Sequence, residues 1–315
     1  MNTLNEKAKK AMRPLLGVIA KFNLPCKLAI KLFHTYISPI ILYNVENWTI
    51  LTDKKLANFT ATSLFNDTNE SKSDRVHRNL LKYILGASKS TPNMAVYGET
   101  GEIPLSLKGY RLMLSYWKRL TCMPEDSLAR KALTENVNLR TNWIKTIEKL
   151  VQTFNLIEVN DAQFTDKAKS SIREYYINSW KNKLANEEMP RLNVYKIVNS
   201  NFDTHKHLEL PYNMRKIISK IRCSNHALEI ERGRHTKPKT PPDVRLCKIC
   251  ENGEIEDEAH FLLNCEVYQN LRVKYSIEFD TIYALLNMDE QSRLAEYLLS
   301  SFQLRERLLN GRGRE

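Results

Sequence analysis

The stretch Cys247-Lys-Ile-Cys250 is separated by nine residues from His260, and four further residues separate His260 from Cys265. A Cys-x2-Cys pair allows one tight turn to present two thiolates to a single metal ion. His260 and Cys265 complete a tetrahedral set of three sulfurs and one imidazole nitrogen, which suits zinc. All four positions are filled by protein ligands and none is left for a catalytic water. The sequence therefore predicts a structural zinc site in the C-terminal part of the chain.

A disulfide between Cys247 and Cys250 is the main alternative to a metal site. The cluster holds an odd number of cysteines, and residues 1–20 do not have the layout of a cleavable signal peptide. Both features favour reduced thiols and metal binding. The remaining cysteines, Cys26, Cys122 and Cys223, are predicted to be buried as small hydrophobic residues.

Three acids, Glu256, Asp257 and Glu258, precede His260 in the sequence. We expect them to lie at the N-terminus of a helix that carries His260, where the helix dipole favours negative charge. In the alternative, one of them orients the imidazole of His260 as an outer partner of the metal site.

The composition favours a helical, basic protein. The 315 residues carry a net charge of +12, 42% of them are hydrophobic, and only nine are glycine. Such a charge favours a polyanionic partner. No uncharged apolar run approaches the roughly 18 residues of a membrane span. We therefore expect no membrane association and a cytoplasmic or nuclear protein that is not secreted.

Apolar residues at helical spacing predict a mainly α fold, in which a helical bundle is followed by the small zinc-binding unit. One predicted helix covers residues 26–50, is kinked by Pro39, and buries a face that includes Phe33, Tyr36 and Tyr43. His34, on the same helix, has no partner nearby in sequence and is predicted to be a surface or capped residue. The predicted segments are a helical segment 1–58, a flexible loop 59–74, a helical segment 75–204 with 191–204 irregular, a basic arm plus zinc-binding unit 205–275, and a C-terminal helix and tail 276–315.

The segment from His205 to Arg245 concentrates positive charge, with ten cations against four acids and a net charge of +6. A helix is predicted over residues 212–222, with its isoleucines packed inward and its cations largely facing outward. A basic arm next to a zinc unit is typical of phosphate-backbone binding, although a solvated linker is the alternative. The candidate nucleic-acid contacts are Arg215, Lys216, Lys220, Arg222, Arg232, Arg234, Lys237 and Lys239.

Three stretches together resemble a known family. They run from Leu32 to Tyr43, from His77 to Leu105, and from Ile221 to Arg272. In order and spacing they are similar to the C-terminal part of reverse transcriptases of LINE-type (non-LTR) retrotransposons, over about residues 5–275. The resemblance implies thumb-like helices in residues 1–58, a helical connector in 75–204, and a CCHC zinc knuckle. It also implies that the knuckle region contacts RNA and DNA, with Cys247, Cys250, His260 and Cys265 as zinc ligands.

The residues that a polymerase needs are not found in this sequence. Reverse transcriptases of this family hold two metal ions with a paired Asp-Asp step, and the chain contains no Asp-Asp pair. No Gly-rich phosphate loop, nucleophile elbow or His-Glu-x-x-His motif occurs either. We therefore expect a non-enzymatic, nucleic-acid-binding fragment that lacks the polymerase palm and the endonuclease, with the missing polymerase part as a further possible partner. The alternatives are a zinc-stabilised helical protein-interaction module and a non-functional remnant of a decayed element.

Overall fold

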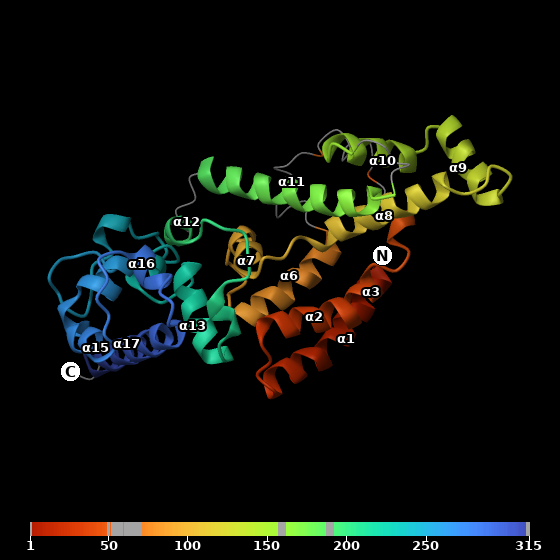
Figure 1. The fold of residues 1–315 in the computed structure, drawn as a ribbon. Coiled ribbons are helices and arrows are strands. Elements are labelled where there is room, and N and C mark those ends of the chain that lie inside the picture. Colours follow the sequence, from red (N-terminus) through yellow and green to blue (C-terminus); the bar gives the residue numbers. More distant parts are fainter. Residues whose placement is uncertain are drawn as a thin grey trace. The chain divides into compact units, whose positions relative to one another are not determined.

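The computed structural model describes residues 2–48, 51, 59, 71–156, 162–186 and 192–312. Within these residues the chain is helical, with no β-strand and two isolated bridges, Thr100–Thr204 and Leu246–Ile255 (Figure 1). The mainly α fold predicted from the sequence is confirmed. No helix in this described part combines the length and the apolar character needed to cross a membrane. The α-helices are α1 (Asn2–Lys21), α2 (Cys26–Tyr36), α3 (Ser38–Ile41), α4 (Val45–Trp48), α6 (Lys72–Leu85), α7 (Asn93–Thr100), α8 (Leu105–Thr121), α9 (Leu128–Asn138), α10 (Asn142–Thr153), α11 (Phe164–Asn186), α12 (Asn193–Val198), α13 (Tyr212–Arg222), α14 (Glu229–Arg232), α15 (Gln269–Lys274), α16 (Ile282–Leu286) and α17 (Gln291–Arg312).

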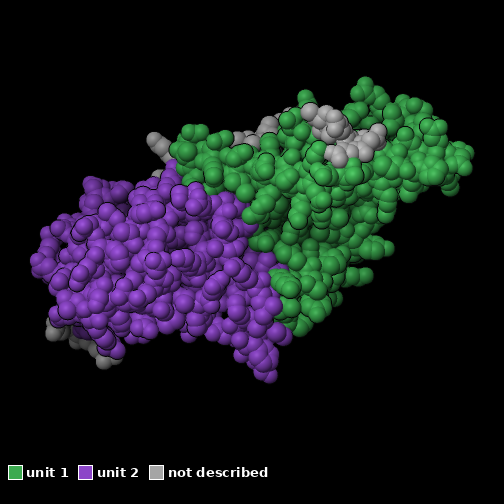
Figure 2. Space-filling view, in the orientation of Figure 1, with its two compact units in different colours: residues 1–17, 31–79, 102–187 green, residues 18–30, 80–101, 188–315 purple. Residues whose placement is uncertain are grey.

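The chain forms two compact units, each built from three separate segments (Figure 2). Unit 1 comprises Met1–Gly17, Lys31–Asn79 and Glu102–Glu187, and unit 2 comprises Val18–Ile30, Leu80–Gly101 and Glu188–Glu315. The predicted segments are continuous in sequence, whereas 75–204 contributes to both units. The difference arises because contacts between residues distant in sequence define a compact unit.

The predicted loop 59–74 falls mostly on residues that the structure does not describe, since 60–70 lie outside the described ranges. At its C-terminal end the prediction is too long, because α6 begins at Lys72. Phe59 is buried and packs edge-to-face on Tyr110, so this residue belongs to the core of unit 1.

The core of unit 1 forms around α8, which contacts α4, α9, α10 and α11. α8 buries Leu107, Met113 and Leu114, and α11 buries Tyr176 and Trp180. The helices that join them begin at side-chain caps, for example Ser127, which accepts a hydrogen bond from the backbone N–H of Arg130 at 3.2 Å.

The helix predicted over 26–50 is divided into α2, α3 and α4. Pro39 lies in the first turn of α3, where its missing N–H costs nothing. The buried face was assigned wrongly in part: Phe33 is buried, but Tyr36 and Tyr43 are 64% and 70% exposed. Tyr36 shares α2 with Phe33 but lies off its buried face, and Tyr43 lies between α3 and α4, where the helical period no longer applies.

Unit 2 has a large hydrophobic core that includes Cys247 and Cys265, two of the candidate metal ligands. Ile218 and Ile221 of α13 and Leu294 and Leu298 of α17 are buried in the same cluster as Cys265. α13 has the bounds predicted from the sequence. Because these cysteines share this core, the segment that carries them is an integral part of unit 2.

Two smaller predictions need correction. The segment 191–204 was expected to be irregular, but α12 forms within it and buries Tyr195. A helix of this length is too short to show a clear apolar period. Cys26 and Cys223 are buried as predicted, whereas Cys122 at the end of α8 is exposed.

Candidate metal centre

The first two candidate ligands, Cys247 and Cys250, lie on a tight hairpin. The backbone N–H of Cys247 donates to the carbonyl of Glu254 at 2.8 Å, and an isolated bridge joins Leu246 to Ile255. Gly253 adopts φ = 74°, a conformation that glycine tolerates without a steric penalty. The turn folds the chain back on itself, and the sulfurs of Cys247 and Cys250 lie in the same cluster of donor atoms.

His260 and Cys265 come from the turn that follows the hairpin. Residues His260–Asn264 form a wide π-helical turn, in which the N–H of Cys265 donates to the carbonyl of His260 at 2.7 Å. Asp257 accepts a hydrogen bond from the backbone N–H of His260 at 2.7 Å. Asp257 therefore caps this turn, as expected for an acid at a helix N-terminus.

The four predicted ligands converge. Their donor atoms all lie within 4.8 Å of one another, and Cys250 Sγ is 3.4 Å from His260 Nε2. In a tetrahedral zinc site a sulfur and a nitrogen ligand are about 3.5 Å apart, given the usual bond lengths. Cys247, Cys250, His260 and Cys265 thus form a cluster that could hold a metal ion, as predicted.

Burial favours the neutral form of the thiols in the cluster. Cys247, His260 and Cys265 are buried, and Cys250 is half-buried. Burial raises the pKa of Cys265 to about 12 and also raises the pKa of Cys247. A bound metal cation stabilises thiolates and would reverse this effect. The donor set, three thiols and one imidazole, fits a soft or borderline divalent ion.

The outer partner of His260 is Glu254, which the sequence analysis did not identify. Its Oε2 lies 2.5 Å from Nδ1 of His260, while Nε2 faces Cys250. The contact has an ion-pair distance without hydrogen-bond geometry, and a carboxylate that accepts from Nδ1–H would fix the tautomer in which Nε2 is free to bind metal. The acids expected in this role have other partners, because Glu256 pairs with Arg305 and Glu258 pairs with His226. The position of Glu254 in the turn between the Cys-x2-Cys pair and the histidine is the only sequence signal for it.

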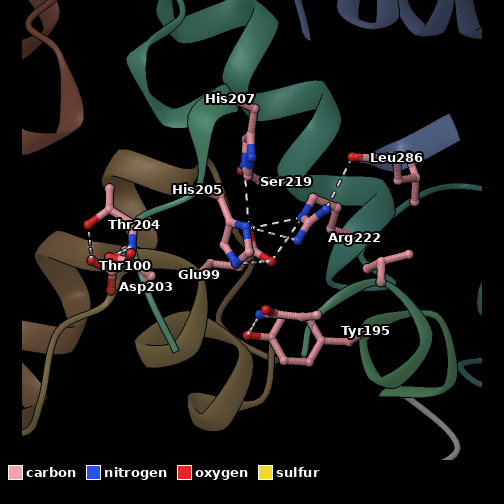
Figure 3. A network of polar contacts seen from close by, with 12 residues as sticks. Glu99, Thr100, Tyr195, Asp203, Thr204, His205, His207, Ser219, Arg222 and Leu286 are labelled. Carbon is pink, nitrogen blue, oxygen red and sulfur yellow. Dashed lines mark hydrogen bonds and ion pairs between the residues drawn. The ribbon is translucent and has the colours of Figure 1, made fainter. Parts of the chain in front are cut away.

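Two of the candidate nucleic-acid contacts, Arg215 and Arg222, are buried, each with 1% exposure. Arg215 donates to the carbonyls of Ile84 at 3.1 Å and Leu24 at 2.9 Å. Arg222 donates to both carboxylate oxygens of Glu99, at 2.9 and 3.1 Å (Figure 3). The prediction that these two side chains face outward is wrong. The two arginines lie seven residues apart on the same face of α13, and that face is turned to the interior of unit 2.

The other candidate contacts are more accessible. Lys216 and Lys220 are half-buried, and Lys237 and Lys239 are exposed. The side chain of Arg232 is 54% exposed and lies 3.4 Å from Glu229. Arg234 is 17% exposed and lies 3.0 Å from Glu231, so an acid partly neutralises each arginine. Lys237 and Lys239, on either side of Pro238, are thus the exposed lysines among the candidate contacts.

Comparison with known proteins does not place the chain in a family. No protein-family model, curated protein or solved structure matches it.

Proposed function

We propose that this chain is a non-enzymatic, zinc-stabilised nucleic-acid-binding module that corresponds to the C-terminal part of a LINE-type reverse transcriptase. The observation that carries the proposal is the Cys3His cluster on a hairpin that directly follows the exposed cations Lys237 and Lys239. In this proposal the metal holds the hairpin, and the hairpin presents the basic segment to phosphate groups.

The proposed metal is Zn²⁺ in a structural role. Three thiolates and one imidazole match the ligands that zinc prefers, and four protein ligands leave no position for a reactive water. The short distance from Glu254 to His260 supports the same role, because such outer partners stabilise metal-binding histidines.

The proposed phosphate contacts are fewer than the sequence suggested. Arg215 and Arg222 are not among them, since both are buried in unit 2 and bound to protein groups. Arg234 has a minor part at most, because it is largely buried beside Glu231. The remaining contacts are Lys216, Lys220, Arg232, Lys237 and Lys239.

The resemblance to retrotransposon reverse transcriptases supports RNA or DNA as the partner, with a separate polymerase part of the same element as a second partner. Polymerase activity is not proposed for this chain, because its sequence has no Asp-Asp pair. The proposed compartments are the cytoplasm and the nucleus, where thiols stay reduced.

The proposal is tested by fluorescence anisotropy with labelled single-stranded RNA and duplex DNA, over salt concentrations from about 50 to about 200 mM. We expect affinity to fall steeply with salt. Replacing Lys237 and Lys239 by glutamine should weaken binding to all sequences and reduce the slope of log K against log salt by about two, because two fewer phosphates are neutralised.

A charge-matched control separates local contacts from the overall charge of the protein. Lys131 and Lys181 are exposed lysines of unit 1, and their double replacement by glutamine removes the same charge. This control should keep the wild-type slope. An equal decrease in affinity in both double variants would mean that net charge alone drives binding and would contradict the proposed site.

A protein-interaction module is the alternative function. Apolar side chains beside the hairpin favour it, since Val244, Leu246 and Ile255 are 53%, 41% and 36% exposed. Binding that is indifferent to salt, and indifferent to the lysine replacements, would support this alternative. A chain that binds neither nucleic acid nor protein would fit a remnant of a decayed element.

A further inference from the structure

A second cluster of metal-binding side chains lies in unit 1, distant in sequence from the Cys3His cluster. His34 of α2, His77 of α6 and Glu102, in the segment that precedes α8, bring one donor atom each to within 4.8 Å of one another. We propose that these three residues bind a divalent first-row transition ion, with Zn²⁺ as the first candidate, in a site separate from the hairpin.

The distances between the donor atoms fit one ion. Glu102 Oε2 lies 2.9 Å from His34 Nε2 and 3.5 Å from His77 Nε2. Ligands of a tetrahedral zinc ion are about 3.3 Å apart when each bond is about 2.05 Å. All three donor atoms lie within 4.8 Å of one another, so small side-chain movements would place them around one centre.

The surrounding residues hold the imidazoles in place. The ring of Phe33 stacks on the ring of His77, with centroids 5.0 Å apart and an interplanar angle of 13°. His77 is fully buried, and burial lowers its pKa to about 3. Its imidazole is therefore neutral at pH 7, which is the form that binds metal.

The chemistry of the donors identifies the class of ion. Two imidazoles and one carboxylate bind zinc and the other late first-row divalent ions, whereas magnesium and calcium prefer oxygen donors. The side chains of His34 and Glu102 are 23% and 20% exposed, so solvent reaches the site from their side. Three protein ligands leave a coordination position open on that side.

The ammonium group of Lys108 lies where the proposed metal ion would bind. Its Nζ lies 2.8 Å from His34 Nε2 and 3.7 Å from Glu102 Oε2. Its side chain is 29% exposed and can swing outward. Zinc and this ammonium group would compete for Glu102 and His34, because both cannot occupy the same space. Removal of Lys108 should therefore strengthen metal binding, which a merely structural polar cluster would not do.

The sequence analysis assigned no ligand role to His34, since no partner is close to it in the chain. Its partners are 43 and 68 residues away in sequence, at His77 and Glu102. The packing of α2 and α6 with the start of α8 is what brings the three side chains together.

The test is the zinc content of the full chain, measured by elemental analysis after equilibration against buffered zinc. We expect two zinc ions for each wild-type molecule and one for His34→Gln or Glu102→Gln. These two residues are partly exposed, so their replacement should leave the fold intact. Lys108→Met should keep two ions and reach half occupancy of the second at a lower free zinc concentration.

Cobalt substitution shows which site is filled. Cobalt in the Cys3His cluster gives sulfur-to-metal charge-transfer absorption, whereas cobalt bound by two histidines and a glutamate gives only the weaker ligand-field bands. The ligand-field bands should persist in Cys265→Ser, where the charge-transfer bands are reduced, and should weaken in Glu102→Gln. His235→Gln, a change to an exposed histidine of unit 2, is the matched control and should keep both sets.

A wild-type chain that takes up a single zinc ion, lost in Cys265→Ser and unchanged in His34→Gln and Glu102→Gln, would overturn the proposal. So would unchanged zinc affinity in Lys108→Met. Neither result depends on whether the chain binds nucleic acid, so the two proposals fail or succeed separately.

Discussion

The buried network of Glu99, Arg222, His205 and His207 shows how single residues organise the interior of unit 2 (Figure 3). Arg222 binds Glu99 and also donates to the carbonyl of Leu286 at 3.3 Å, so its charge and most of its donors are satisfied. His207 is buried beside this pair, with Nε2 3.0 Å from Ser219 Oγ. Breaking a buried ion pair is costly. The pair between Glu99 of α7 and Arg222 of α13 therefore holds these two helices together.

The pH dependence of stability should report on His207. Burial, together with the positive charges of Arg222, His205 and Arg215, lowers the pKa of His207 well below its ordinary 6.5. Glu99 Oε2 lies 3.5 Å away but is already paired with Arg222. A depressed histidine pKa favours the native state above pH 6.5. Stability should therefore fall as the pH decreases below 6.5, by up to about 1.4 kcal/mol per pH unit from this residue.

The measurement is urea unfolding of zinc-loaded protein between about pH 7.5 and about pH 5.5, for the wild type and for His207→Gln. Protonation of the metal ligands destabilises both proteins at low pH. The contribution of His207 is the difference between the two slopes, and the slope should be shallower in the variant. Parallel slopes would mean that His207 does not titrate with unfolding.

At the scale of elements, Arg305 connects α17 to the hairpin that carries the candidate metal ligands. Arg305 Nε and Nη2 donate to the two carboxylate oxygens of Glu256 at 2.7 and 2.6 Å. Glu256 is fully buried, and its Oε2 also accepts from the backbone N–H of Glu229 at 2.8 Å. The hairpin, α14 and α17 thus meet at one carboxylate, close in sequence to His260.

Removing the arginine should loosen the hairpin. Arg305→Ala leaves the buried Glu256 without its main counter-charge, and a change of this kind typically costs about 3–5 kcal/mol. We expect a corresponding decrease of stability in urea and a faster transfer of zinc to a chromogenic chelator. Arg307→Ala, an exposed arginine on the same helix, is the control and should behave as the wild type. Equal zinc transfer from both variants would show that α17 does not support the metal site.

At the scale of the whole molecule, the two units should differ in their dependence on a metal ion in the Cys3His cluster. Cys247 and Cys265 lie in the same hydrophobic cluster as Ile218 of α13 and Leu298 of α17. Zinc sites of this type supply folding free energy to the segments that bind them. Removal of the metal from the Cys3His cluster should therefore disturb unit 2 well beyond the hairpin.

Hydrogen exchange of the Cys265→Ser variant tests this expectation. Backbone amides of α13 and α17 should exchange faster, since their core includes the missing ligand. Amides of α8 and α11, which form the core of unit 1, should keep their protection. Equally reduced protection in both units would mean that they unfold together. Protection unchanged in α13 and α17 would contradict a structural role for the metal.

Local sequence patterns predict both the Cys3His cluster and the helix at 212–222. Cys247, Cys250, His260 and Cys265 are recognisable because metal ligands must lie at short, fixed separations on a tight hairpin and turn. The helix at 212–222 was predicted with its observed bounds because its isoleucines recur at helical spacing. In both cases the residues that interact are near neighbours in the chain.

The helical class, the basic arm and the four-ligand cluster follow from the order of the amino acids. Tertiary packing is needed to place Arg215 and Arg222 in the interior, Glu254 beside His260, and His34 against His77 and Glu102. The physical reason is that a helical period shows which residues share a face, but the neighbours of that face are set by elements far away in the chain. A buried arginine and an exposed one have the same local sequence signal. The distant groups that accept its hydrogen bonds distinguish them: Glu99 for Arg222, and the carbonyls of Ile84 and Leu24 for Arg215.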